Sequence, residues 1–459
     1  MLAWRSYISG CEWEGPVSPM ESPVGKRRRV TALMTKYPTL KNIGILVTGT
    51  GFAQAVAMVA MVFTARMFTP EIFGQFAVFG SLTTIAITIA SMRMDMAIML
   101  PEDDDSARRI ARIATVSNIV VALLFAVAAV VGRNLIISVY GSENLASWMP
   151  IGALTIFFVA QVTVLQYWFN RRTDYKTISL NRMQQQVASS GGQLAFGALG
   201  VRTLPGLILG TMAGQALAFV NLRLRSKDLV QPISDDTPSA KALLSEYKKM
   251  PLLNMPTALV DAIRLNGIVL LIGSVALGAV GQFNLAWRLL QVPIGLINSA
   301  ISQVFFQKLA RVKPGGMTRL VRFTMMRSLL ISLVPFGLLY LLAPWLFTVV
   351  FGHQWDLAGD IARALTPWLM MQLVTSPIST VFVVTGKQQW SLMFAVVFCA
   401  SPLALLQFST MDLLPTIRWL GILMAAMLAT NLVLADFAAR SFDREGPEVQ
   451  EPTEEETDA

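Results

Sequence analysis

The sequence predicts an all-α integral membrane protein with about twelve transmembrane helices, arranged as two six-helix halves with pseudo-twofold symmetry around a central cavity. Of its 459 residues, 54% are hydrophobic and only 14% are charged, whereas soluble domains carry about 25% charged residues. Apolar runs long enough to cross a bilayer recur from Ile43 onward. Lys and Arg gather on alternate sides of these runs, as they do in multi-pass membrane proteins.

The predicted spans follow one another with short connections. The fifth is the least apolar, because "QQQVASSGGQLAFGALG" is rich in Gln, Ser and Gly, and such a helix suits packing among other helices through small residues. The spans cover about 43–66, 73–92, 110–131, 149–169, 184–201, 205–222, 252–276, 281–306, 326–349, 363–385, 389–408 and 417–437.

The positive charges predict the orientation. With the N-terminus inside, 29 Lys and Arg fall in cytoplasmic segments and 5 in the opposite segments. This distribution supports an even number of spans with both termini in the cytoplasm.

Two copies of one tripeptide indicate an internal repeat. Gly74-Gln75-Phe76 opens the second span and Gly281-Gln282-Phe283 opens the eighth. Six-span halves insert the same way round, which is the arrangement of parallel repeats related by an axis along the membrane normal. The predicted divisions are a disordered cytoplasmic segment (1–41), a first half (42–222), a basic cytoplasmic linker (223–251), a second half (252–437) and an acidic disordered tail (438–459).

Few residues are available for covalent or metal chemistry. Cys11 and Cys399 offer neither a disulfide framework nor zinc-ligand spacing, and His353 is the one histidine. No nucleophile elbow, phosphate-binding loop or zinc-protease motif occurs. We therefore expect no metal, no cofactor, no nucleic-acid partner and no enzymatic activity.

Several stretches resemble the bacterial polysaccharide, or O-antigen repeat-unit, flippases of the multidrug/oligosaccharidyl-lipid/polysaccharide exporter superfamily. They are "ARMFTPEIFGQFAVFGSL", "SMRMDMAIMLPEDDDSA", "NRRTDYKTISLNRMQQQV", "VVTGKQQWSLM" and the region from "YKKMPLLNMP" to "FFQKLAR". The resemblance covers about residues 40–436. It implies a monomer in the inner membrane of a bacterium that moves polyprenyl-diphosphate-linked oligosaccharides from the cytoplasmic to the periplasmic leaflet for lipopolysaccharide or exopolysaccharide synthesis. It also implies contact with membrane lipids, a polysaccharide polymerase and chain-length machinery.

Such a cargo needs a wet, cationic cavity, and charges within spans are the candidates for it. Arg264 and Arg288 are expected to bind the diphosphate, because a guanidinium pairs with phosphate oxygens bidentately. Asp261 lies three residues before Arg264 on the same helical face. The alternatives are a structural Asp261–Arg264 pair and, for Asp261, a proton or sodium site.

Three more charges lie at the ends of the first two spans. Arg66, Arg93 and Asp95 match charged positions of the resembled family and are expected to be either gate residues or interfacial anchors.

Two other functions stay open. A drug or organic-cation antiporter of the same superfamily would favour an acidic, aromatic cavity. A membrane polysaccharide polymerase would be expected to carry a substantial outer loop, whereas the longest outer segment here is about 132–148.

Overall fold

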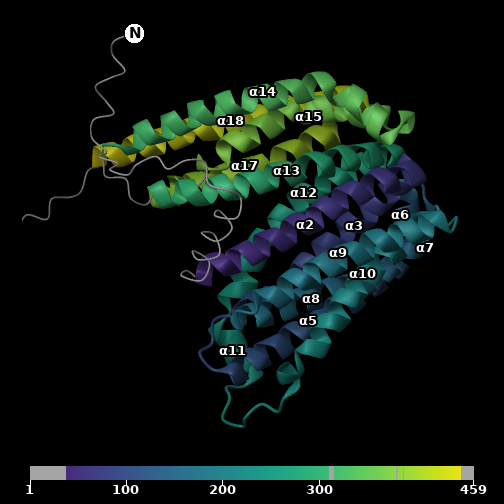
Figure 1. Ribbon diagram of the computed structural model, residues 1–459, viewed down its shortest axis with the longest axis vertical. Coiled ribbons are helices and arrows are strands. Elements are labelled where there is room, and N and C mark those ends of the chain that lie inside the picture. Colours follow the sequence, from purple (N-terminus) through teal and green to yellow (C-terminus); the bar gives the residue numbers. More distant parts are fainter. Residues whose placement is uncertain (1–37, 310–314, 379–380, 386, 446–459) are drawn as a thin grey trace, which may run out of the picture.

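The fold is built of helices. The computed structural model describes residues 38–309, 315–378, 381–385 and 387–445, and those ranges contain no strand (Figure 1). Twelve helices within them have 20 residues or more, and they follow the order of the predicted spans. They are α2 (Pro38–Met67), α3 (Pro70–Ala90), α5 (Asp104–Val131), α8 (Gly152–Arg171), α9 (Tyr175–Ala198), α10 (Leu204–Arg225), α12 (Met255–Val275), α13 (Leu277–Leu309), α14 (Met317–Phe351), α15 (Asp356–Thr375), α17 (Gln388–Phe408) and α18 (Leu413–Glu445).

Eight helical segments of the described chain are long and apolar enough to cross a membrane by length and composition. The long helices outside this set are α9, α13, α15 and α17. α9 carries a run of glutamines and α13 carries Arg288. Polar side chains that face other helices or a cavity lower a helix's mean hydropathy without exposing charge to lipid.

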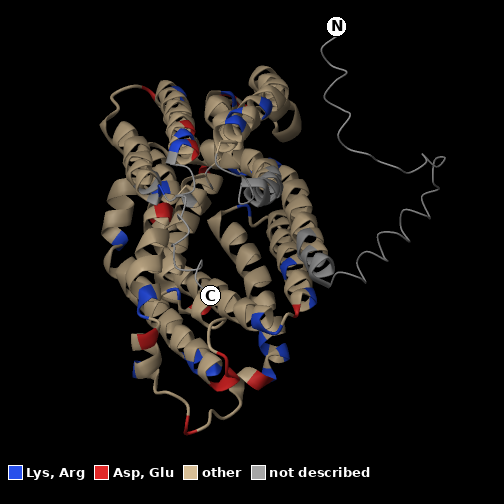
Figure 2. Cartoon of the chain, turned by 90° about the vertical axis from the view of Figure 1, so that its left-hand side faces the viewer, with Lys and Arg blue, Asp and Glu red and all other residues tan. Residues whose placement is uncertain are grey.

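The long helices form two arms that meet at one end and diverge at the other (Figure 1). α2 to α10 make the first arm, α13 to α18 make the second, and α12 lies between them. The joined end carries α6 (Arg133–Tyr140), α7 (Glu143–Trp148) and His353, and the open end carries α11 (Ala240–Glu246). Figure 2 looks onto the open end, where Lys and Arg occur on both arms.

The two GQF copies meet where the arms join. A Cβ atom on Gly281 would lie 1.8 Å from the carbonyl oxygen of Pro70 and 2.9 Å from the amide nitrogen of Gly74. A Cβ atom on Gly74 would lie 1.7 Å from the carbonyl oxygen of Leu277. Both positions therefore require glycine, because the backbones of α3 and α13 touch there. The repeated tripeptide marks a contact between the arms.

The glutamines that follow these glycines also have related surroundings. Gln75 accepts a hydrogen bond from Asn144, which precedes α8, at 3.2 Å. Gln282 accepts one from the amide of Ala358, near the start of α15, at 2.9 Å, and donates another to the carbonyl of Gln354. α8 and α15 correspond to the fourth and tenth predicted spans. Gln75 thus ties α3 to the segment just before α8, and Gln282 ties α13 to the first turn of α15.

The linker 223–251 is packed onto the first arm rather than free. Asp228 accepts a hydrogen bond from the indole of Trp168 at 2.8 Å and pairs with Arg172 at 2.7 Å. Arg112 donates to the carbonyl of Gln231 at 2.7 Å. Leu243 of α11 is buried against α4 (Met94–Ala97) and α5.

The helices extend beyond some predicted boundaries. α2 begins at Pro38, inside the segment 1–41, and α18 continues to Glu445, inside the tail 438–459. Residues 438–445 are helical rather than disordered, because the side chains of Ala438 and Ala439 are buried against the second arm. Residues 1–37 and 446–459 lie outside the described part of the chain. The chain between α15 and α17 is broken into shorter pieces. α15 ends at Thr375, and the short helix α16 covers Val381–Val384.

The end of α18 stabilises the start of α14. The Asp443 carboxylate accepts hydrogen bonds from the backbone amides of Gly315, Met317 and Thr318 at 2.8, 3.0 and 2.8 Å. The first amides of a helix have no partner within the helix, and a negative charge there also favours the helix dipole. One side chain of α18 therefore caps another helix.

Two truncated chains, one that keeps Asp443 and one that lacks it, should differ in stability. A chain ending at Glu445 should match the full-length protein in membrane level and in thermal unfolding in detergent. A chain ending at Ser441 should be less stable by about 1–2 kcal/mol, the typical value of a helix cap. Asp443→Ala in the full chain should reproduce this loss. Equal unfolding midpoints for the two truncations would contradict the capping role.

Candidate functional site

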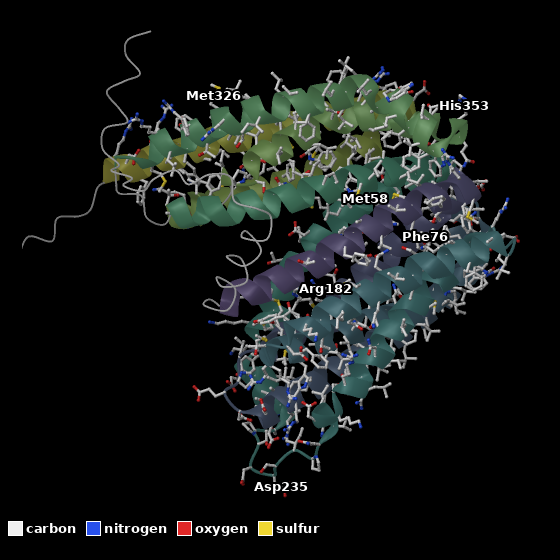
Figure 3. The ribbon with its side chains drawn as sticks, in the orientation of Figure 1. Met58, Phe76, Arg182, Asp235, Met326 and His353 are labelled. Carbon is white, nitrogen blue, oxygen red and sulfur yellow. The ribbon has the colours of Figure 1, made fainter. Side chains whose placement is uncertain are left out.

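A polar cavity of about 420 Å³ opens on the side of the first arm that faces the second arm. This volume lies within the range of small-ligand sites, roughly 300–1,000 Å³. α2, α3, α9 and α10 form most of its wall, and α13 contributes Arg288. Among its lining residues, Arg182 lies toward the open end and Phe76 toward the joined end (Figure 3).

α9 provides one continuous polar face of this cavity. Its lining residues recur every three or four positions, so they lie on one side of the helix over roughly 16 Å. Asp174 begins the helix by accepting a hydrogen bond from the amide of Thr177 at 3.1 Å. The cavity-facing residues of α9 are Arg182, Gln185, Gln186, Ser189, Ser190 and Gln193.

Glycines bring α9 and α10 into backbone contact. A Cβ atom on Gly192 would lie 2.8 Å from the carbonyl oxygen of Gly210, and one on Gly214 would lie 2.1 Å from the Ser189 hydroxyl. The predicted packing of the fifth span through small residues is found. This close approach places Thr211 and Gln215 of α10 beside the polar face of α9.

Arg288, predicted from the sequence, lines this cavity with its side chain exposed to it. Within the described part of the chain, its guanidinium has no hydrogen-bond or ion-pair partner. The preceding Trp287 stacks on Phe283 at 6.0 Å and packs against Trp368 at 4.6 Å, measured between ring centroids. The contact with Trp368 of α15 holds α13 in the orientation that presents Arg288 to the cavity.

Arg182 is a cavity residue that the sequence interpretation missed. The predicted fifth span starts only at residue 184 and leaves Arg182 in an inner loop, but α9 begins earlier, at Tyr175, and places Arg182 on the wall. Its guanidinium donates to the Thr50 hydroxyl at 3.3 Å and to the Gln166 side chain at 3.2 Å. Both partners are neutral. The signal was the polar spacing of α9, which continues back from Gln185 to Arg182.

A cleft joins this cavity along the boundary between α2 and α13. It also measures about 420 Å³ and shares Gln54, Ala57, Met61 and Arg288 with the cavity. The rest of its wall is mostly apolar and comes from both arms. Those residues are Met58, Trp287, Leu289, Gln291, Val292 and Gly295.

The predicted Asp261–Arg264 pair forms, but away from Arg288. The two side chains are 3.4 Å apart, and the Arg264 guanidinium lies 5.3 Å from the ring centroid of Phe398 on α17. Neither Arg264 nor Asp261 lines the cavity or the cleft. The structure thus brings Arg288 together with Arg182 rather than with Arg264.

Arg66 connects the arms at the joined end. Its guanidinium donates to the carbonyls of Val350 at 2.9 Å and Val349 at 3.1 Å, in the last turn of α14. The neighbouring Ala65 carbonyl accepts from the indole of Trp355 at 2.8 Å. A cation at a helix C-terminus interacts favourably with the helix dipole. Arg66 is therefore part of an inter-arm contact and not of the cavity wall.

Arg93 and Asp95 lie in the connection between α3 and α5. Arg93 directly precedes the short helix α4, and Asp95 lies within it. Arg93 has a left-handed backbone, with φ of 59°. Asp95 is buried and accepts a hydrogen bond from the Ser91 hydroxyl at 2.6 Å. Neither residue lines the cavity or the cleft. The surroundings of Asp95 are those of a residue that shapes the turn.

The described residues contain no cluster of three or more His, Cys, Asp or Glu side chains that could hold a metal ion.

The chain is similar to known proteins in sequence and in fold. A family described as polysaccharide biosynthesis proteins matches residues 63–359. No curated protein matches the chain. An inward-facing multidrug resistance transporter of the MATE family, in the MOP superfamily, is similar over 85% of this chain and 96% of its own, with TM-score 0.65 and 13% identity.

Two further solved structures are similar. The lipid II flippase MurJ in an inward closed conformation has TM-score 0.62 and 14% identity, over 86% of this chain and 90% of its own. An outward-facing MATE transporter of the MOP superfamily has TM-score 0.54 and 15% identity, over 88% and 96%. At these identities the likeness concerns the fold, and it confirms the predicted all-α membrane architecture. The chain is a multi-pass membrane protein of the polysaccharide biosynthesis family, with the fold of MOP-superfamily transporters.

Proposed function

We propose that this protein is a flippase that moves polyprenyl-diphosphate-linked oligosaccharides from the cytoplasmic to the periplasmic leaflet of a bacterial inner membrane. The observation that carries the proposal is the composition of the cavity. Its described lining includes two arginines and many amides and hydroxyls, but no Asp or Glu. A diphosphate linked to a glycan needs this combination of cations and neutral hydrogen-bonding groups.

Arg288 is proposed as the principal ligand of the diphosphate. An arginine at membrane depth without a counter-charge is unfavourable, and a dianionic ligand would supply that charge. Arg182 also contacts only neutral groups and is proposed as a second ligand nearer the open end. The roles of Arg264, Asp261, Arg93 and Asp95 as site residues remain predictions, and their contacts favour structural roles.

The cleft between α2 and α13 offers a place for the polyprenyl tail. Its wall is largely apolar and comes from both arms, and it meets the cavity at Arg288. A lipid tail in the cleft would therefore leave the diphosphate beside Arg288 and the glycan in the polar cavity.

Lys and Arg at the open end support a cytoplasmic location for it, with both termini inside. The diverging arms then correspond to an inward-facing state. Whether a polymerase or chain-length machinery binds here stays a prediction, as does the monomeric state.

An organic-cation antiporter is a less suitable function for this cavity, because two arginines without a lining carboxylate would repel a cation. A polymerase is also a less suitable function, because the connection between α5 and α8 at the joined end consists of the short helices α6 and α7, a 3-10 turn at Met149–Ile151 and short turns, and is not a substantial outer loop.

Depletion of the protein tests the proposal. Lipid-linked glycan should accumulate in the cytoplasmic leaflet, where a lectin added to spheroplasts cannot reach it, and surface polysaccharide should fall. Accumulation in the lectin-accessible leaflet would indicate a defect after translocation, as in a polymerase mutant. Normal polysaccharide combined with increased drug sensitivity would instead support an antiporter.

A further inference from the structure

The wall formed by α9 and α10 offers amides that the protein itself does not use. Within the described residues, the side chains of Gln54 and Gln185 have no hydrogen-bond partner, although both line the cavity. The Oε1 atom of Gln215 is buried and also has no partner. Each primary amide supplies two donors and one acceptor. Amides that face one cavity without a protein partner are available to hydrogen-bond a ligand there.

Other polar groups of the wall are held in place by internal hydrogen bonds. Gln186 donates to Ser190 at 2.8 Å, and Gln193 donates to the Thr211 hydroxyl at 2.7 Å. Ser189 donates to the Thr211 carbonyl at 3.1 Å. The glycine contacts between α9 and α10 make the backbone beneath them a rigid support. Sites on rigid, supported helices hold their polar groups in fixed positions.

Among the described residues that line the cavity and the cleft, the second arm contributes few such groups. The Gln291 amide in the cleft is already bonded to Gln372 at 3.1 Å. Its described neighbours in the cleft wall include Trp287, Val292 and Gly295, whose side chains are apolar or absent. Within this described lining, the groups that could bind a polar cargo are therefore concentrated on the first arm.

We infer that the α9–α10 wall, with Gln54 of α2, is the surface that recognises the sugar part of the cargo. Gln54, Gln185 and Gln215 hydrogen-bond the hydroxyl or acetamido groups of an uncharged sugar, while Arg288 binds the adjoining diphosphate. Amides suit this role because each sugar hydroxyl both donates and accepts. The inference rests on the proposed function and assigns the glycan to one arm of the site.

Binding measurements on the full-length protein in lipid nanodiscs test this assignment. The probes are one polyprenyl diphosphate without sugar and the same lipid carrying N-acetylglucosamine, glucose or galactose. The wild type should bind at least one glycosylated lipid about tenfold or more tightly than the bare lipid, the gain expected from a few hydrogen bonds. The double variant Gln185→Met/Gln215→Met should lose that preference but keep its affinity for the bare lipid.

Gln184→Met is the matched control. Gln184 is the neighbour of Gln185 on α9, but it accepts a hydrogen bond from Asn221 and lines a different groove, together with Phe52 and Leu180. This variant should bind all the probes like the wild type. Arg288→Ala should weaken binding of bare and glycosylated lipids alike.

Three outcomes would overturn the inference. If the wild type binds bare and glycosylated lipids with equal affinity, the protein does not recognise the sugar, but the proposed flippase function is not contradicted. Equal weakening of both ligands by the double variant would show that the amides only support the fold. Failure of the wild type to bind any of the lipids would overturn the proposed function as well.

Discussion

Arg288→Ala should abolish export of the lipid-linked glycan while the protein remains in the membrane at its normal level. Hydrogen bonds to charged groups contribute about 1.5–3 kcal/mol each. Losing two of them to the diphosphate would weaken binding roughly 100-fold or more. Because the side chain faces the cavity and has no described protein partner, its removal should not destabilise the fold. The measurement is surface polysaccharide in a deletion strain that carries the variant.

Two comparisons sharpen this prediction. Arg288→Lys keeps the charge but loses the planar fork, so it should restore export only partly. Arg264→Ala removes a guanidinium that pairs with Asp261 and lies over Phe398. The Arg264→Ala variant should unfold at a lower temperature than the wild type, while export per molecule of protein should change little. Wild-type export by a normally inserted Arg288→Ala variant would show that the cavity arginine is dispensable.

Gly281→Ala should disrupt the junction of the arms. The new Cβ atom would lie 1.8 Å from a backbone oxygen, which no side-chain rotation can relieve. Overpacking typically costs about 1–3 kcal/mol, and a backbone clash should reach or exceed the upper end. Gly74→Ala should behave in the same way, because its Cβ atom would lie 1.7 Å from the Leu277 oxygen. Thermal unfolding and membrane level measure the effect.

Each helix provides its own control. At Gly80 on α3 and Gly278 on α13, an added Cβ atom would meet no neighbouring atom within 4 Å. Alanine at these sites should be neutral or stabilise the helix by up to about 1 kcal/mol. The same substitution should thus have opposite signs at neighbouring glycines. If Gly281→Ala and Gly278→Ala unfold at the same temperature, the junction is not a fixed contact.

The sequence predicted the helices well, because long apolar runs and the distribution of Lys and Arg report directly on insertion into a membrane. Even α9, the least apolar of the predicted spans, was recognisable by its length and small residues. The sequence does not show, however, that the polar face of α9 lines a cavity, because this depends on how α2 and α10 pack around α9. For this reason the sequence alone leaves Arg182 in a loop.

The candidate site was harder to predict, since depth in the membrane does not tell which way a charge points. Arg264 and Arg288 are equivalent in sequence terms, as both are cations within a span. The structure separates them: the Arg264 guanidinium pairs with Asp261 and lies over Phe398, whereas Trp368 packs against Trp287 so that Arg288 faces the cavity. The contacts with Phe398 and Trp368 join helices that are far apart in the sequence, so periodicity within one helix could not reveal them.

The packing of residues 226–247 against the first arm shortens the tether between the halves. Asp228, Gln231 and Leu243 are bound to the first arm, and Met250, in the π-helical turn that runs directly into α12, packs against the same cluster as Leu243. A short tether raises the effective concentration of one domain near the other and restricts how far they can separate. A separation of the two arms would therefore be an intramolecular step, and the short length of chain between Leu243 and α12 would set an upper limit on it.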